Sequence, residues 1–456
     1  MACIRIPTSQ KKYMPVVATY FLFNLLCFLQ MYSIGIGALA VTLVLVGLGC
    51  LVRFELMGVY VFTALPFFNV MNSSVGSTSL FYLLLGVTAV RYLIQGFERS
   101  TPIKISLLLL IVVVTCSNLN AQMRYLQWLI RLTPLVLFYN SPFIKNKLSQ
   151  IIDAYAISLV VASLWGHLML KAGTSIYTRN YVYAEGTSTT RLAGLVGDSV
   201  MYAIQLLFLI SLLFVLMIKK RERRSVRCTL IVVLVVFGLL TYSKTFLGCL
   251  LLQLLFVYVY QVRQTRATVK SLLRDLLVVS VILAVMMGVL YYIFTAESLW
   301  ATNIRTRLLA ADLSTGRLTV WKYYLDWFME DVKNIIFGMG FAEYAVRRTF
   351  HSPSGGVFNI LYAHNIFLET AVVFGGVIAF LLLVILIIWM EKTYRKHRDV
   401  LIFLPLFVFL TVGMISHGHF EYSTYLNLLL ILMVADGDGF DSKSKEQRPS
   451  TLEAFT

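Results

Sequence analysis

Residues 194–224 read GLVGDSVMYAIQLLFLISLLFVLMIKKRERR, a long apolar run that ends in a cluster of basic side chains. A helix needs about 20 mostly apolar residues to cross the hydrocarbon core of a bilayer, and this run is long enough. Lysine and arginine are enriched on the cytoplasmic side of such helices. The segment therefore predicts a membrane-spanning helix whose basic end, from Lys219 to Arg224, faces the cytoplasm.

Similar apolar runs recur along nearly the whole chain. Of its 456 residues, 59% are hydrophobic and 13% are charged, and the mean hydropathy is +0.80. Soluble domains carry about 25% charged residues, so the main solvent of this chain is lipid. We predict an all-α polytopic membrane protein with about 12–14 transmembrane helices. The candidate spans lie near residues 13–32, 34–52, 56–71, 77–95, 103–119, 123–139, 150–171, 194–218, 228–242, 245–260, 276–295, 359–390, 400–416 and 420–435.

The basic residues indicate how these spans are oriented. With the amino terminus in the cytoplasm and the spans alternating, all but thirteen of the 39 lysines and arginines fall on the inner side. The net charge of +17 is therefore mostly a topology signal, and we expect no nucleic-acid partner. Residues 1–435 form a single membrane domain with two long outer segments, at about 172–193 and 296–358. Residues 436–456 form a polar cytoplasmic tail that is expected to be disordered.

Thirteen basic residues remain on the outer side, several of them beside apolar spans. They are Arg124, Arg131, Lys171, Arg179, Arg191, Lys244, Arg305, Arg307, Arg317, Lys322, Lys333, Arg347 and Arg348. Basic groups at membrane depth are costly and commonly line a cavity or a pathway. The planar fork of arginine matches phosphate oxygens, so a cluster at the outer leaflet suits a lipid-linked phosphate or pyrophosphate. The alternative is that these side chains extend to the lipid headgroups without binding a ligand.

Arg124 and Arg131 stand seven residues apart in the sixth span, which places them on one helix face with Trp128 between them. Arg131 lies about 10 Å deeper than Arg124 in such a helix, and it needs an acidic partner, a phosphate or water. Structural pairing and ligand binding fit this position equally well.

The segment 314–328 predicts an amphipathic helix on the outer surface of the membrane. Ser314 or Thr315 can cap its start, and apolar residues then recur at helical spacing. These residues are Leu318, Trp321, Leu325 and Phe328. Arg317 lies in the first turn, where the helix dipole disfavours a cation unless an anion is near. The residues Phe337 to Gly340 that follow predict a turn.

His364 and Glu369 begin the twelfth span, whose apolar run from 359 to 390 exceeds what a bilayer requires by about ten residues. The surplus turns set His364 near the outer interface, where an imidazole exchanges protons near neutral pH. Glu369 lies about one turn deeper and can orient it. His417 and His419 form the last outer turn, but their spacing matches no strong zinc motif.

Four outer-side motifs occur in a recognisable order. They are Arg191-Leu192-Ala193-Gly194, Tyr242-Ser243-Lys244-Thr245, Thr315-Gly316-Arg317-Leu318-Thr319-Val320-Trp321 with Phe337-Gly338-Met339-Gly340, and His364-Asn365-Ile366-Phe367-Leu368-Glu369 with Gly375-Gly376. This set resembles the O-antigen ligase and O-antigen polymerase (Wzy-type) superfamily of bacterial membrane glycosyltransferases. The resemblance covers roughly residues 190–390, whereas the amino-terminal spans match only in hydrophobicity.

The resemblance implies a metal-independent glycosyltransferase that uses no cofactor. Its donor would be a glycan on undecaprenyl pyrophosphate, and its active site would face the periplasm or exterior from the bacterial cytoplasmic (inner) membrane. The family's cationic positions fall on Arg191, Lys244 and Arg317, and its histidine falls on His364. The family usually carries arginine where this chain has Lys244, which keeps the charge but loses the bidentate fork.

The chemistry divides these residues between two roles. Fixed cations in a partly dry site neutralise a pyrophosphate leaving group without a metal, which assigns Arg191 and Arg317 to catalysis. His364 is the candidate base for the acceptor hydroxyl, with Glu343 and Asp198 as alternatives. Substrate-binding positions are expected at Lys244, Arg305, Arg307, Arg124 and Glu369.

The favoured function is a polymerase that joins lipid-linked repeat units of a surface polysaccharide, such as O-antigen, capsule or exopolysaccharide. A ligase that attaches finished glycan to lipid A-core or another acceptor uses the same donor and chemistry. A lipid-linked glycan flippase or other transporter is a third hypothesis, but the chain shows no paired halves of the kind common in transporters. Membrane lipids are partners in each case, and a regulator of chain length is compatible with the first.

Overall fold

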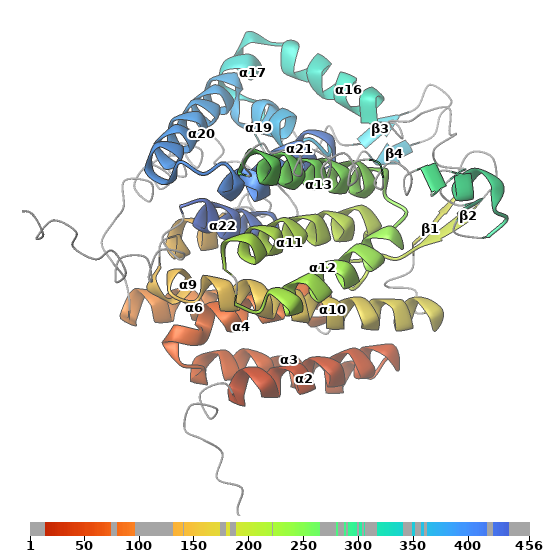
Figure 1. Cartoon of the computed structure of the whole chain (residues 1–456), viewed down its shortest axis with the longest axis vertical. Helices are drawn as coiled ribbons and strands as arrows, with labels where there is room; N and C mark the ends of the chain where they lie inside the picture. Colours follow the sequence, from red (N-terminus) through yellow and green to blue (C-terminus); the bar gives the residue numbers. More distant parts are fainter. Residues whose placement is uncertain are drawn as a thin grey trace, which may run out of the picture.

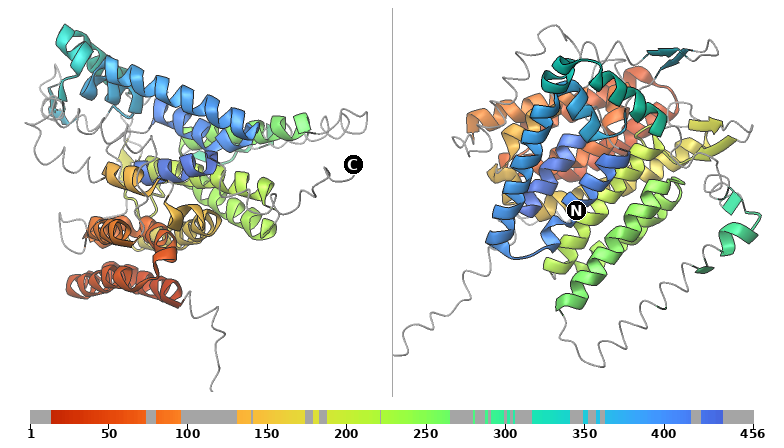
Figure 2. Two further views of the ribbon diagram at one scale, coloured as in Figure 1. Left: turned by 90° about the vertical axis from the view of Figure 1, so that its left-hand side faces the viewer. Right: turned by 90° about the horizontal axis from the view of Figure 1, so that it is seen from above.

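The computed structural model of the chain is almost entirely α-helical in the part that it describes (Figure 1). This part comprises residues 14–73, 80–95, 131–139, 141–173, 179–182, 188–220, 222–264, 280, 287–288, 291–298, 301–302, 305, 317–340, 349–351, 357–359, 363–416 and 423–436. The helices are stacked in layers, with α2 and α3 at one edge and α16, α17 and α20 at the opposite edge (Figures 1 and 2). The helical class therefore agrees with the prediction.

Five described helical stretches are long and apolar enough to cross a membrane. They are Phe54–Asn72, Leu148–Lys171, Ser199–Lys219, Lys244–Gln264 and Gly376–His397. Five shorter apolar helices accompany them, at Val16–Met31, Gly35–Leu51, Leu80–Gln95, Leu401–Ile415 and Thr424–Ala435. The predicted set of fourteen spans is thus supported only in part, and the spans near 103–119 and 276–295 lie wholly or largely outside the described residues.

The amino-terminal helices form one edge of the stack (Figure 1). They are α2 (Met14–Met31), α3 (Gly35–Leu51), α4 (Met57–Ala64), α5 (Phe68–Ser73) and α6 (Leu80–Gln95). Two 3-10 turns, η1 (Phe54–Leu56) and η2 (Leu65–Phe67), flank α4. Pro66 lies in η2, where its ring and missing N–H disturb the α-helical hydrogen bonds. The predicted third span is therefore one continuous but irregular helical stretch.

The centre of the fold is α11 (Ser199–Lys219), in which every residue from Met201 to Leu216 is buried. A helix that is apolar on all sides is stable when other elements surround it. The helices that contact it are α10 (Leu148–Lys171), α12 (Arg224–Leu239), α13 (Lys244–Gln264), α21 (Leu404–Ile415) and α22 (Thr424–Ala435). The predicted span at 194–218 starts five residues later than expected, because Asp198 accepts hydrogen bonds from the first amides and caps the helix.

The last long helix, α20 (Gly376–His397), has the opposite character. Thr393 is its one buried residue, although most of the helix is apolar. Its outward side chains include Phe380, which is 64% exposed, and Ile387, which is 55% exposed. Soluble proteins rarely leave so large an apolar surface uncovered, so this surface faces lipid. The chain is an α-helical membrane protein.

The prediction of one unbroken span over 359–390 is wrong. The chain forms α19 (Ile366–Phe374), turns at Gly375 with φ of +91°, and continues as α20. The turn after α17 packs against this break, and the Met339 amide donates a hydrogen bond to the Val372 carbonyl oxygen at 2.9 Å. A β-carbon on Gly375 would overlap the Ile336 carbonyl oxygen. The close approach of two backbones therefore divides an apolar run that hydropathy alone predicts to be continuous.

The two long outer segments contain both helices and hairpins. The expected short helices are present as α16 (Arg317–Met329) and α17 (Val332–Phe337). The sequence did not predict the hairpins, in which β1 (Arg179–Val182) pairs antiparallel with β2 (Ser188–Arg191) and β3 (Thr349–His351) pairs with β4 (Val357–Asn359). The remaining short elements are α9 (Pro142–Lys145) and η4 (Leu401–Phe403).

The helix α16 turns a different face to the protein than its apolar spacing predicts. Tyr324 is fully buried and Trp321 is half-buried, whereas Leu318 is 63% exposed and Leu325 is 47% exposed. The helix therefore has two apolar faces, one for the protein and one that suits the membrane surface. The predicted capping residues at 314–315 lie outside the described residues.

The turns on either side of the helices form two groups, which we name the inner end (the turns 219–224 and 397–400) and the outer end (the turns 191–198, 240–244 and 415–416). At the inner end the Lys219 ammonium pairs with Asp399, and His397 Nε2 lies 2.6 Å from the Asp436 carbonyl oxygen. These contacts join the turn after α11 to the turn after α20 and to the end of α22. Asp436 follows the last helix and contacts Tyr139 and His397, and residues 437–456 of the predicted tail lie outside the described residues.

Candidate active site

At the outer end, Arg191 finishes the first hairpin and is held against the turn between α12 and α13. Its side chain is 2% exposed, and its Nε donates a hydrogen bond to the Thr241 carbonyl oxygen at 2.8 Å. The neighbouring amide of Leu192 donates to the Leu240 carbonyl oxygen at 3.2 Å. A buried guanidinium is stable only when oxygens or an anion compensate its charge. These contacts fix one cation at the outer end.

Lys244 is the first residue of α13 and follows a strained turn. Tyr242 has φ of +49°, a left-handed conformation that is uncommon for residues other than glycine. Ser243 Oγ accepts a hydrogen bond from the Phe246 amide at 3.3 Å and so caps the helix. The Lys244 Nζ atom is shielded from solvent, and the dipole of α13 opposes a cation at this end. The Lys244 charge and the helix dipole would both favour an anion at this position.

Arg317 is joined to that same turn through one hydroxyl group. It is the first residue of α16, and its Nη1 donates hydrogen bonds to Ser416 Oγ at 2.6 Å and to the Ile415 carbonyl oxygen at 3.0 Å. Ser416 Oγ in turn lies 2.9 Å from Thr245 Oγ1, beside Lys244. The start of α13, the start of α16 and the end of α21 therefore meet at Ser416.

His364 lies in the short segment before α19 and is positioned through its neighbours. Its own φ is +51°, a strained conformation for a side chain of this size. The amide of Ala363 donates to Glu369 Oε1 at 3.1 Å, and the carbonyl oxygen of Ala363 accepts from Trp321 Nε1 at 2.7 Å. Asn365 Oδ1 accepts from two amides and caps α19. Glu369, which is fully buried, thus acts on the peptide next to His364.

The surroundings of His364 keep its imidazole neutral. Burial, followed by the positive charge of Arg317, lowers the pKa of His364 to about 4, while the Asp198 carboxylate opposes this shift. The imidazole is therefore unprotonated at pH 7 and can accept a proton. The predicted near-neutral pKa is wrong, because sequence spacing reveals neither the burial of the ring nor its distance from Arg317.

Arg191, Lys244, Arg317 and His364, which the sequence singled out from separate motifs, are thus linked in the structure through shared neighbours. Arg317 acts electrostatically on His364, and Ser416 connects Arg317 to the turn that carries Lys244 and contacts Arg191. Three cations can bind an anion with two phosphate groups. A neutral imidazole beside them can take a proton from a hydroxyl.

Other predicted positions do not join this group. Arg305 Nη1 donates to the Phe294 carbonyl oxygen at 3.0 Å, and within the described residues no contact links it to the four. Arg131 Nε donates to the Tyr82 hydroxyl at 2.7 Å, a partner that the sequence did not predict. The positions that lie outside the described residues are Arg124, Arg307, Glu343, Arg347, Arg348, His417 and His419.

Sequence reasoning missed the residues that connect the site. Ser416 belongs to none of the four motifs, Thr245 was quoted in one but given no role, and Thr241 contributes only a carbonyl oxygen. Their single sequence signal is position, since Thr245 follows Lys244 and Ser416 precedes the last outer turn. Among the residues that the structure describes, no three His, Cys, Asp or Glu side chains lie close enough to hold a metal ion.

The class that fold and site define is a helical membrane protein with a cationic, histidine-containing cluster at one end of its spans. Compared with known protein families and with curated protein sequences, the chain matches none.

Proposed function

We propose that this protein is a polymerase of a bacterial surface polysaccharide that works on the outer face of the cytoplasmic membrane. It takes glycan from undecaprenyl pyrophosphate and joins it to a sugar hydroxyl of a lipid-linked repeat unit. The observation that supports the proposal is that Arg317 lies near a neutral His364 and is linked through Ser416 to the turn that carries Lys244 and contacts Arg191. A diphosphate donor and a hydroxyl acceptor need cations and a base at one place.

The reaction transfers one glycosyl group. The bond between the anomeric carbon and the pyrophosphate oxygen breaks, and its electrons leave with undecaprenyl pyrophosphate. The acceptor oxygen forms the new bond to the anomeric carbon, and its proton passes to His364. Arg191, Lys244 and Arg317 stabilise the charge that develops on the leaving group, where a preorganised donor contributes a factor of about 10²–10³ in rate.

Donor binding also strengthens the proposed base. Arg317 lowers the His364 pKa through its positive charge, and a bound pyrophosphate offsets that charge. The His364 pKa therefore rises toward the ambient pH in the complex, where a base transfers protons most efficiently. Asp198, which already raises this pKa, acts in the same direction.

The test uses purified protein in detergent with a synthetic undecaprenyl-pyrophosphate oligosaccharide, with and without a chelator. Arg317→Ala is expected to lower turnover about a hundredfold. Lys322→Ala is the matched control, because this lysine lies on the same helix but is exposed, and it is expected to retain activity. His364→Asn removes the imidazole while tolerating the left-handed backbone, and a loss of about 10²–10⁴ is expected.

The products separate the related functions. Lengthened lipid-linked glycan supports a polymerase, and activity that survives the chelator supports catalysis without a metal. Glycan transferred once to a lipid A-core acceptor, with no lengthening, would instead indicate a ligase. Full activity of both Arg317→Ala and His364→Asn in folded protein would show that the site is misassigned. A complete lack of transferred or lengthened glycan with the unaltered, folded protein would favour a transporter.

A further inference from the structure

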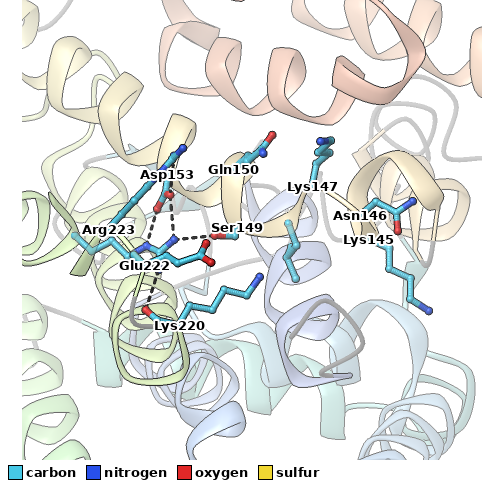
Figure 3. Close-up of a pocket in the computed structure, with 11 residues that line it drawn as sticks. Lys145, Asn146, Lys147, Ser149, Gln150, Asp153, Lys220, Glu222 and Arg223 are labelled. Carbon is cyan, nitrogen blue, oxygen red and sulfur yellow. Dashed lines mark hydrogen bonds and ion pairs between the residues drawn. The ribbon is translucent and has the colours of Figure 1, made fainter. Parts of the chain in front are cut away.

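A pocket with a volume of about 160 Å³ opens at the inner end of the molecule (Figure 3). Its walls come from α9 and the residues after it, from the first turns of α10, and from the turn between α11 and α12. Figure 3 shows Asp153, Glu222 and Arg223 gathered on one side and Lys145 and Lys147 on the other. None of these residues belongs to the candidate active site.

One wall of the pocket is fixed by a buried ion pair. Arg227 is 1% exposed, and its Nε and Nη2 donate to the two carboxylate oxygens of Asp153 at 2.9 and 3.1 Å. Its Nη2 also donates to Ser149 Oγ at 2.7 Å. Arg223 Nη1 lies 3.6 Å from the same carboxylate. The negative charge of Asp153 is therefore already engaged by two arginines, and little of it reaches the opening.

The remaining charge of the pocket is strongly positive. Five basic and two acidic side chains line it, so its net charge is +3. Lys145, Lys147 and Lys220 are half-buried around the opening instead of extending fully into solvent. The amino terminus of the long helix α10 lies among them and adds the positive end of its dipole. Topology explains why lysines occur at the inner end, but not why three of them surround a cavity.

A second cavity adjoins the first and is mostly apolar. It has a volume of about 280 Å³ and shares Asn146 and Lys147 with the cationic pocket. Phe54 and Phe143 form its walls with ring centroids 5.2 Å apart, and Glu55 completes the lining. A soluble phosphate has no apolar group that could fill an aromatic cavity. A phospholipid has an anionic phosphate joined to an apolar body. The phosphate suits the cationic pocket, and the apolar body suits the adjoining aromatic cavity.

We propose that these two cavities bind one anionic phospholipid, with its phosphate-bearing headgroup among Lys145, Lys147 and Lys220 and its glycerol and upper acyl chain in the cavity that Phe54 and Phe143 line. Basic pockets between helices on this side of a membrane suit anionic headgroups. The bound lipid screens the repulsion among the three lysines and links α9, α10 and the turn after α11. This role is independent of the proposed polymerase activity.

The test measures lipid binding to the detergent-purified full chain by native mass spectrometry, with dioleoyl phosphatidylglycerol and dioleoyl phosphatidylcholine as probes. The pocket variant carries Lys145→Gln, Lys147→Gln and Lys220→Gln. The matched control carries Arg263→Gln, Lys392→Gln and Arg398→Gln, which removes equal charge from exposed positions at the inner end. A basic residue near an anionic lipid surface contributes about a fivefold gain in binding, so the pocket variant is expected to lose at least tenfold.

The proposal is supported if phosphatidylglycerol binds the unaltered protein at least tenfold more tightly than phosphatidylcholine. The pocket variant must lose this preference, and the control variant must keep it. If the unaltered protein binds the two lipids equally, this result alone overturns the proposal. An equal loss in the control variant overturns it in favour of diffuse surface charge. Complete displacement of phosphatidylglycerol by millimolar glycerol 1-phosphate overturns it in favour of a soluble phosphate ligand.

Discussion

A fall in pH from about 7.5 to about 5 is expected to leave the proposed transferase nearly as active as before. An ordinary histidine has a pKa near 6.5, so only about 3% of it is neutral at pH 5. His364, whose pKa is lowered to about 4, stays about 90% neutral at that pH. The proton-accepting form of the base therefore persists, and kcat/KM falls only as the pH approaches 4.

Two substitutions are expected to move this inflection in opposite directions. Arg317→Gln removes the positive charge that lowers the His364 pKa, so the inflection moves to higher pH. Asp198→Asn removes the opposing negative charge and moves the inflection lower, while asparagine preserves the cap on α11. Burial is the largest cause of the shift and is unchanged, so the inflection of Arg317→Gln is expected to stay below 6.5.

The assay follows initial rates of glycan transfer at donor concentrations below KM, because kcat/KM reports the pKa of the free enzyme. Each variant is normalised to its own maximum, so that the position of the inflection is separated from the loss of rate. The unfolded chain binds a proton at His364 below about pH 6.5, whereas the folded chain resists protonation until about pH 4. Stability therefore declines as pH falls through this window, and recovery of activity at pH 7.5 is the control for unfolding.

A wild-type inflection near 6.5 would refute this reasoning, because it would mean that the titrating base is neither buried nor close to Arg317. Shifts of Arg317→Gln and Asp198→Asn in the same direction would also refute it. The residual activity of His364→Asn is expected to show no inflection between about pH 4 and 7.

Three further predictions concern the framework. Arg227→Met is expected to destabilise the protein by about 3–5 kcal/mol, because it leaves the buried Asp153 carboxylate without its main partner. Thermal unfolding in detergent should show that adding Asp153→Leu restores most of the loss; no restoration would contradict this account. Gly375→Ala is expected to cost about 1–3 kcal/mol because of its positive φ and its contact with another backbone, whereas Gly248→Ala, in open space on α13, should cost nothing in the same measurement. Ser416→Ala is expected to lower turnover about tenfold, because a hydrogen bond to the charged Arg317 is removed, and an unchanged rate would rule out this positioning role.

The helices were largely predictable because membrane insertion depends on local composition. A run of the required length and hydropathy forms a helix wherever it occurs, as α10, α11 and α13 confirm. The helix predictions were wrong where backbone from a distant part of the chain packs against the predicted helix. The turn at Gly338 packs against Gly375 and breaks the twelfth span, and nothing in the hydropathy of 359–390 signals that contact.

The candidate site was predictable as a set of residues but not as an arrangement. Motif order and cations that the predicted topology places on the outer side selected Arg191, Lys244, Arg317 and His364. Arg305 has the same composition and sidedness, yet it bonds to Phe294 on another segment. Charge and side therefore select candidates, and packing decides which of them meet.

By itself, the sequence determined that the chain is helical and rich in apolar segments suited to a membrane, since both properties follow from the composition of short segments. Tertiary structure alone decided the contacts that join positions far apart in the chain, such as Arg317 with Ser416 and Arg191 with Thr241. It also decided that the imidazole of His364 is neutral, because a pKa depends on burial and on charges that folding brings near. Composition is a property of each segment by itself, whereas the distances between segments are set only when the helices pack together.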